Sequence, residues 1–254
     1  MIDIHSHILP GLDDGAKTLE DSVAMVRLAA ETGTTDIVAT PHANLEYSYD
    51  PDLVDRKIEE LREACGNVLR IYRGCDFHLH YDNIQDALAN PAKYAVNQKS
   101  YLLVEFSELL IARTTDELFH RLRLAGLIPI ITHPERNHLL QQRIELLEYW
   151  ARAGCCLQVT ALSLVGRFGK RAREFSEELM RRRLVHIVAS DAHDPVHRPP
   201  RLDEARDYVT RRYGARRAER LFELNPRAVI EGAPMAEDDE PDEAPERKWY
   251  RFWK

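Results

Sequence analysis

The first fifteen residues, MIDIHSHILPGLDDG (1–15), contain an alternating run followed by a turn. Alternate side chains of a β-strand lie on one face, so Asp3, His5 and His7 would point the same way. The turn then supplies a carboxylate at Asp14. Two imidazoles on one face beside a carboxylate are typical of a metal site. The stretch therefore predicts a first strand that leads directly into a metal site.

Further apolar or β-branched runs follow the first one, and amphipathic stretches separate them. The seven runs are IDIH (2–5), TDIVAT (35–40), VLRIYRG (68–74), SYLLVEF (100–106), LIPIITH (127–133), CCLQVT (155–160) and LVHIVASD (184–191). Helical patterns span 18–33, 52–65, 82–89, 114–125, 139–153 and 170–183, with two or three more between 201 and 232. Strands that alternate with crossover helices predict a parallel sheet, and seven of them predict an α/β barrel.

The length and charge of the chain limit the classes of protein it can belong to. Its 254 residues suit one large core, and we expect residues 1–234 to form a single catalytic domain. No stretch approaches the ~20 apolar residues of a membrane span. The histidines close to Met1 leave no room for a secretory leader, so we expect a cytoplasmic protein. The net charge of −7 argues against a nucleic-acid partner.

The composition changes near the C-terminus. Residues 236–246 are rich in Glu, Asp and Pro, and the last eight residues read RKWYRFWK. We expect 235–254 to be a flexible acidic linker with a basic and aromatic tail. One hypothesis is that the tail docks on a partner or a neighbouring active site. The alternatives are an unstructured end or contact with a membrane surface.

Side chains that bind metals follow the predicted strands at their carboxyl ends, where an α/β barrel carries its chemistry. These residues are His5, His7, Asp14, His42, Asp76, Glu105, His133, Asp191 and His193. Imidazoles and carboxylates without thiolates suit divalent Mn, Fe or Zn, and nine ligands are too many for one ion. Three divalent cations against four carboxylates would leave about +2, a balance that favours a phosphate monoester.

Other polar residues allow more than one interpretation. Arg136 and Arg198 lie just beyond His133 and His193 and could fork across phosphate oxygens. His78 and His80 form a second His-x-His pair, which we interpret as rim or structural residues because it lies past the strand end. Asp13 is a weaker candidate ligand than Asp14, since either could serve the turn. His186 lies inside an apolar run and is interpreted as a core histidine.

The motifs HSH, DDG, PH, EFS, HPER and SDAH, in this order and spacing, resemble the polymerase and histidinol phosphatase (PHP) superfamily. More narrowly, MIDIHSHILPGLDDG, THPERN and ASDAHDPVHRPP resemble bacterial capsule-type, manganese-dependent protein tyrosine phosphatases. The likeness runs from Met1 to about Gly232. The resemblance implies a distorted (β/α)7 barrel that holds three metal ions. It also implies that the metal is manganese.

The resemblance also implies how the ligands are shared among the ions. His5, His7, Glu105 and Asp191 would hold one ion; Glu105 would bridge to a second with Asp76 and His133; Asp14, His42 and His193 would hold the third. The group usually has glutamate where this chain has Asp76. The implied substrate is phosphotyrosine in the tail of a bacterial tyrosine kinase that controls capsule or exopolysaccharide synthesis. Metal-bound hydroxide would attack phosphorus, with Arg136 and Arg198 neutralising charge.

Rival functions stay open at this point. The same fold could act on histidinol phosphate, another small phosphomonoester or a nucleotide phosphodiester. The domain could also be a noncatalytic metal-binding regulator, and homo-oligomerisation stays open. A metal-dependent amidohydrolase barrel fits less well, because its fourth strand commonly ends in lysine and this one ends in Glu105. A cysteine-dependent phosphatase is excluded, since no cysteine has an arginine six positions later. Asp50 is interpreted as a helix cap.

Overall fold

The computed structural model describes residues 1–236, so nearly all of the expected linker and tail at 235–254 lies outside the described residues. Seven strands lie at the predicted apolar runs, most of them shorter than their runs, and two short strands, His42–Ala43 and Asp76–His78, lie outside the predicted runs. They are β1 (Ile2–Ser6), β2 (Asp36–Ala39), β3 (His42–Ala43), β4 (Arg70–Arg73), β5 (Asp76–His78), β6 (Tyr101–Glu105), β7 (Ile128–Thr132), β8 (Cys156–Thr160) and β9 (Ile187–Ala189).

All strand pairs are parallel and follow each other in chain order. One sheet has the order β1-β2-β4 and the other β3-β5-β6-β7-β8-β9. β3 and β5 begin soon after β2 and β4 end, so each pair is one barrel strand broken in the middle. Backbone bonds from Asp191 to His5 and from His7 to Ala192 join β9 to β1. The predicted distorted (β/α)7 barrel is confirmed.

Each break coincides with one residue that interrupts the strand. Pro41 lies between β2 and β3, and proline has no N–H to donate to a sheet. Gly74 lies between β4 and β5, where a Cβ atom would meet Cγ1 of Val38 at 2.7 Å. The chain therefore passes close to its neighbour at this point and then starts a new strand at Asp76.

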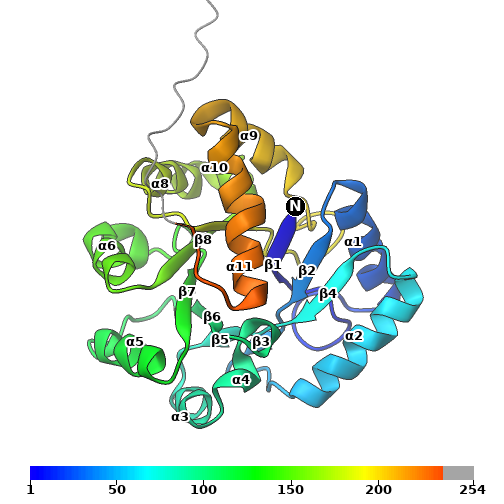
Figure 1. Cartoon of the computed structure of the whole chain (residues 1–254), viewed down its shortest axis with the longest axis horizontal. Helices are drawn as coiled ribbons and strands as arrows, with labels where there is room; N and C mark the ends of the chain where they lie inside the picture. The colour runs from blue at the N-terminus through cyan, green and yellow to red at the C-terminus, as the bar shows by residue number, and fades with distance from the viewer. Residues whose placement is uncertain (237–254) are drawn as a thin grey trace, which may run out of the picture.

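Helices surround the strands (Figure 1). The longer ones are α1 (Leu19–Glu31), α2 (Pro51–Cys65), α3 (Tyr81–Ala89), α5 (Thr115–Leu124), α6 (Ile144–Arg152), α8 (Gly169–Arg181) and α9 (Asp203–Tyr213). Shorter turns are α4 (Pro91–Tyr94), η1 (Val96–Gln98), η2 (Leu140–Gln142), α7 (Ala161–Leu164), α10 (Ala215–Glu219), η3 (Arg220–Leu224) and α11 (Asn225–Glu231). Thr18 and Asp21 form the capping box that starts α1, and Asp50 caps α2 as expected.

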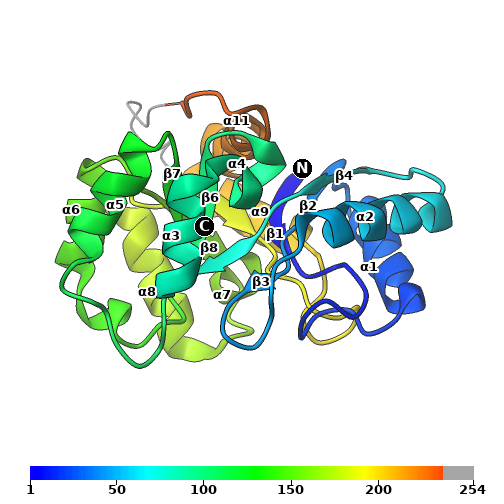
Figure 2. The ribbon, with the colours of Figure 1, turned by 90° about the horizontal axis from the view of Figure 1, so that it is seen from below.

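The barrel interior is apolar at one end and polar at the other. Alternate strand residues such as Ile4, Leu103 and Ile130 fill the interior, and Ile230 of α11 packs with them. Tyr101, at the start of β6, donates a hydrogen bond to the backbone of the segment after α11. Figure 2 shows α11 at this end and the loops after β1 and β9 at the opposite end. The amino ends of the strands are thus closed, and the carboxyl ends face the loops.

Two further findings bear on the expectations from composition. The four cysteines are buried free thiols. Among the described helices, none combines the length and apolar character that crossing a bilayer requires.

Candidate metal centre

The nine predicted ligands lie around the carboxyl ends of the strands, and two of them have unusual backbone conformations. His133 follows β7 with φ of 31°, and Asp191 follows β9 with φ of 51°. Residues other than glycine adopt this left-handed region rarely, and such strain is concentrated at functional sites. Both residues are buried. The barrel therefore holds strained backbone at two of the predicted ligands.

His5 of β1 and His7, the residue after it, turn the same ring atom toward the centre. His5 contacts the amide oxygen of Gln158 through Nδ1 at 2.8 Å, and His7 contacts Asp13 through Nδ1 at 2.7 Å. An oxygen at each Nδ1 favours a proton on that atom, which leaves Nε2 as the atom that would bind a metal. The two Nε2 atoms lie 3.3 Å apart. Both imidazoles are thus oriented as metal ligands.

Asp76 is the test of whether the site fits a cation. Its side chain is fully buried, and neither carboxylate oxygen has a hydrogen-bond partner. Its Oδ2 lies 3.5 Å from Nε2 of His5 and 3.2 Å from Nδ1 of His42, which also lacks a hydrogen bond. A buried carboxylate without partners is costly unless a cation compensates it. These orphaned atoms fit a bound metal ion.

The ligand atoms form overlapping groups that could each hold an ion. The groups are His7, Asp14, His42 and His193; His5, His7 and Asp76; His5, His133 and Asp191; His42, His78 and Glu105; and Asp76, Glu105 and His133. Two of them contain the second and third sets that the resemblance implies. The first implied set is not one group: Asp191 lies with His5 and His133, while Glu105 lies with other partners.

His78 lies beside this centre and belongs to β5, whereas the sequence indicated that it lies past the strand end. Its Nε2 contacts a carboxylate oxygen of Glu105, and both residues share a group with His42. The break before β5 explains the difference: Asp76 and His78 are two residues apart on that strand, so their side chains share a face. Treating DFH as a separate strand would have revealed it.

The two aspartates of the DDG turn have separate tasks. Asp13 is hydrogen-bonded to His7 and accepts hydrogen bonds from the backbone of Gly15 and His42. Asp14 instead approaches Nε2 of His42 at 3.4 Å and Nε2 of His193 at 3.5 Å. The first orients a candidate ligand, and the second faces the group of histidines itself.

The electrostatics of the centre favour positive charge. Burial lowers the pKa of His7, but the adjacent Asp13 outweighs it and raises the pKa to about 9. Burial also opposes a proton on His42, but Asp14 and Asp76 raise its pKa to about 11. Burial and Arg136 lower the pKa of His133 to about 3, so that ring is neutral. Protons and metal ions compete for the same lone pairs, so carboxylates that attract one also attract the other.

Arg136 and Arg198 meet on one carboxylate. Both donate to Oδ2 of Asp191, Arg198 at 2.7 Å. Both guanidinium groups also lie over the ring of Phe168, at 4.4 Å for Arg136 and 5.8 Å for Arg198. Sequence reasoning missed Phe168, because it lies on a loop with no motif of its own. The ring and the carboxylate together fix two cationic forks beside the metal ligands.

Glu135 of the HPER motif helps to hold the arginines and Phe168 in place. Its buried Oε1 accepts hydrogen bonds from the backbone of Thr160 and the hydroxyl of Ser163. These two residues belong to the end of β8 and to α7, the turn that precedes Phe168. Glu135 therefore links the loop after β7, which carries Arg136, to the segment that carries the ring.

Comparison with known proteins agrees with this geometry. Residues 1–231 match the family described as Capsular polysaccharide synthesis, CpsB/CapC. Tyrosine-protein phosphatase YwqE from Bacillus subtilis is 36% identical over 85% of this chain and 86% of its own. Tyrosine-protein phosphatase CpsB from Streptococcus pneumoniae is 32% identical over 91% of this chain and 98% of its own.

A solved structure gives the same answer in three dimensions. It comes from work on YwqE of B. subtilis and CpsB of S. pneumoniae, which are described as metal-dependent tyrosine phosphatases. It aligns with a TM-score of 0.88 at 33% identity and covers 96% of this chain and 100% of that chain. The chain belongs to the CpsB/CapC family of capsular polysaccharide synthesis.

Proposed function

We propose that this protein is a metal-dependent protein tyrosine phosphatase whose catalytic domain spans residues 1–234. The observation that carries the proposal is the shared carboxylate of Asp191, which brings two arginines to the edge of the buried histidine and carboxylate cluster. The family and the names of the relatives support the same reaction class.

The metal ligands in this proposal are the nine predicted residues, and the fit of Asp76 supports them. They are His5, His7, Asp14, His42, Asp76, Glu105, His133, Asp191 and His193, holding three divalent ions, with manganese as the native metal. Bound divalent ions supply Lewis acidity and lower the pKa of coordinated water. His78 is a further candidate, because it contacts Glu105.

Arg136 and Arg198 are the catalytic side chains outside the metal set. A phosphoryl group in transfer carries negative charge on its equatorial oxygens, and two guanidinium forks neutralise it by bidentate hydrogen bonds. The side chain of each arginine is about one quarter exposed, 26% for Arg136 and 25% for Arg198, so substrate can reach both. The phenolic leaving group has a pKa near 10 and needs only modest help from an acid.

The proposed physiological substrate is the phosphotyrosine-containing tail of a bacterial tyrosine kinase that regulates capsule or exopolysaccharide synthesis. The cytoplasm is the proposed compartment, since such a tail lies there. A hollow of about 400 Å³ borders Asp14 and His193 and offers room for a side chain at the metal ligands. A homo-oligomer, and docking of residues 235–254 on a partner or a neighbouring active site, are further parts of this proposal. Both are open to measurement.

Competing substrates give the test. Phosphate release should be compared for a phosphotyrosine peptide, histidinol phosphate and an oligonucleotide, each with and without a chelator. We expect the peptide to give the highest kcat/KM and the chelator to abolish its turnover. A higher kcat/KM for histidinol phosphate would assign the site to a small phosphomonoester instead. No turnover of any substrate, with or without chelator, would indicate a noncatalytic metal-binding protein.

A further inference from the structure

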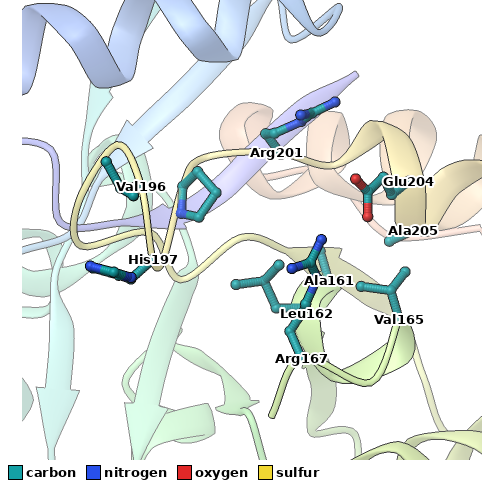
Figure 3. A pocket seen from close by; sticks show the side chains of 10 residues that line it. Ala161, Leu162, Val165, Arg167, Val196, His197, Arg201, Glu204 and Ala205 are labelled. Atoms are coloured by element: carbon teal, nitrogen blue, oxygen red, sulfur yellow. The ribbon is translucent and has the colours of Figure 1, made fainter.

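A second pocket, of about 160 Å³, lies beside the metal centre between the segment that follows β8 and the start of α9 (Figure 3). Its lining comes from α7 and the loop after it, from the loop after β9 and from α9. The residues are Ala161, Leu162, Val165, Arg167, Val196, His197, Pro199, Arg201, Glu204 and Ala205. None of them belongs to the predicted metal or catalytic set.

The pocket adjoins the hollow beside Asp14 and His193, here called the catalytic mouth, through one shared residue. His197 lines this pocket and also the hollow that contains Asp14 and His193. The wall between them is the loop 194–198, which carries Arg198. The carboxylate of Asp194 accepts backbone hydrogen bonds from three residues of this loop, among them Val196 at 2.7 Å and Arg198 at 3.1 Å. The spacing between the pocket and the catalytic mouth is therefore set by a braced loop.

The size and walls of the pocket suit one aromatic ring. A cavity of about 150 Å³ with apolar walls is large enough for benzene. Here the apolar walls come from Leu162, Val165 and Pro199.

Two charged residues of the pocket favour a hydroxyl group on the bound ring. Arg167 lies on the α7 side and Glu204 on the α9 side of the pocket (Figure 3), and neither side chain has a hydrogen bond or ion pair among residues 1–236. A phenol hydroxyl donates one hydrogen bond and accepts another, so it can serve Glu204 and Arg167 together. Glu204 disfavours a phosphate dianion, and Arg167 with Arg201 disfavours a basic side chain.

We propose that this pocket is a specificity subsite for an uncharged phenol, the side chain of a tyrosine that neighbours the phosphotyrosine in the same peptide. The inference rests on the proposed phosphatase function and deepens it, since it names which peptides the enzyme prefers. The phosphotyrosine enters the mouth at the metal centre, and the neighbouring ring enters the pocket on the other side of the loop 194–198.

A peptide series tests the subsite with the full-length, metal-loaded enzyme. One phosphotyrosine is kept, and Tyr, Phe, Ala, Asp or Lys is placed in turn at each position within three residues of it. We expect one position at which Tyr raises kcat/KM about tenfold over Ala, from partial burial of a ring and its hydroxyl bonds. Phe should give a smaller gain, and Asp and Lys none.

Variants of the pocket locate the effect. Arg167→Ala and Glu204→Ala should lower the Tyr-to-Ala ratio of kcat/KM at that position to the Phe-to-Ala ratio, because the apolar walls still bury the ring. Arg171→Ala is the matched control, because Arg171 is exposed on α8 and does not line the pocket. It should keep the ratio. An equal preference for all five residues at every position, or a ratio that survives both pocket variants, would overturn the subsite.

The same assays separate failure of the subsite from failure of the function. Phenyl phosphate has no neighbouring side chain, so its turnover reports on the metal centre alone. Turnover of phenyl phosphate and of all peptides without a positional preference would overturn the subsite and leave the phosphatase standing. No turnover of phenyl phosphate or of any phosphotyrosine peptide would overturn both.

Discussion

Arg198 donates a 2.7 Å hydrogen bond to Oδ2 of Asp191, whose other oxygen faces the imidazoles. Oδ1 lies 3.5 Å from Nε2 of His5 and 3.5 Å from Nε2 of His7. One carboxylate thus connects the metal ligands with the two arginines. Because the carboxylate is buried, the imidazoles and the arginines together fix its position. A change in the arginines should therefore alter the geometry of the imidazoles, and the reverse.

Replacing Arg198 tests the role of the guanidinium. We expect Arg198→Ala to lower kcat for a phosphotyrosine peptide about 10²- to 10³-fold, the range for loss of one group that stabilises transition-state charge. Arg198→Lys should recover only part of the rate, since an ammonium cannot form the bidentate contact. Steady-state kinetics with metal analysis of each variant gives the measurement. A lysine variant as fast as the natural enzyme would contradict the assignment.

Phe168 positions the two arginines. Loss of the ring removes both cation–π contacts, and we expect Phe168→Leu to reduce kcat about 3- to 30-fold. Phe168→Tyr keeps the ring and should keep most of the rate. The ratio between these variants in kcat, at unchanged metal content, distinguishes positioning from packing. Equal losses in both variants would mean that the ring itself has no such effect.

Asp76 bears on both metal binding and stability. Its buried carboxylate has no hydrogen-bond partner, so Asp76→Asn should lower the metal content by about one ion per chain. In metal-free protein Asp76 faces His5 and His42, whose pKa values it raises, so the same change removes these ion pairs and we expect a lower melting temperature. Elemental analysis and thermal unfolding after chelation give the two readouts. An unchanged metal content, or a metal-free variant as stable as the natural chain, would contradict this account of Asp76.

Gly15 tests how closely the DDG turn packs on β1. An added Cβ atom would lie 2.2 Å from the backbone oxygen of His7 and 2.4 Å from its Cβ. We expect Gly15→Ala to lower the free energy of unfolding by about 1–3 kcal/mol and to weaken metal binding, because His7 must move. Gly126→Ala is the control: its φ of 85° makes alanine costly, but no atom lies within 4 Å. That variant should lose stability and keep its metal affinity, as measured by urea unfolding and metal titration.

The architecture could be predicted from the sequence because each strand is a short apolar run that ends in polar residues. Alternating side chains in IDIHSH and apolar runs with polar ends are local patterns, and the seven barrel strands follow from them. The placement of His78 past the strand end was wrong, because the break at Gly74 depends on close approach to Val38, a contact between strands far apart in the chain. Which aspartate orients His7 and which faces the metal ligands depends on the conformation of the turn. The sequence of two adjacent aspartates does not determine that.

Phe168 and the second pocket had no sequence signal for a similar reason. The ring is important only because two loops bring Arg136 and Arg198 over it, and those loops follow different strands. The pocket depends on where α7 lies relative to α9, although α7 is a four-residue turn with no helical pattern of its own. Periodicity predicts elements, and it does not predict how the ends of separate elements meet.

The central claim is that buried histidines and carboxylates hold several divalent cations that the reaction requires. The most direct measurement is metal content per chain in protein purified without added metal, paired with phosphate release from a phosphotyrosine peptide before and after chelation. We expect more than one divalent ion per chain, loss of turnover when the ions are removed, and recovery when manganese is returned. Full turnover by a metal-free chain would contradict the account.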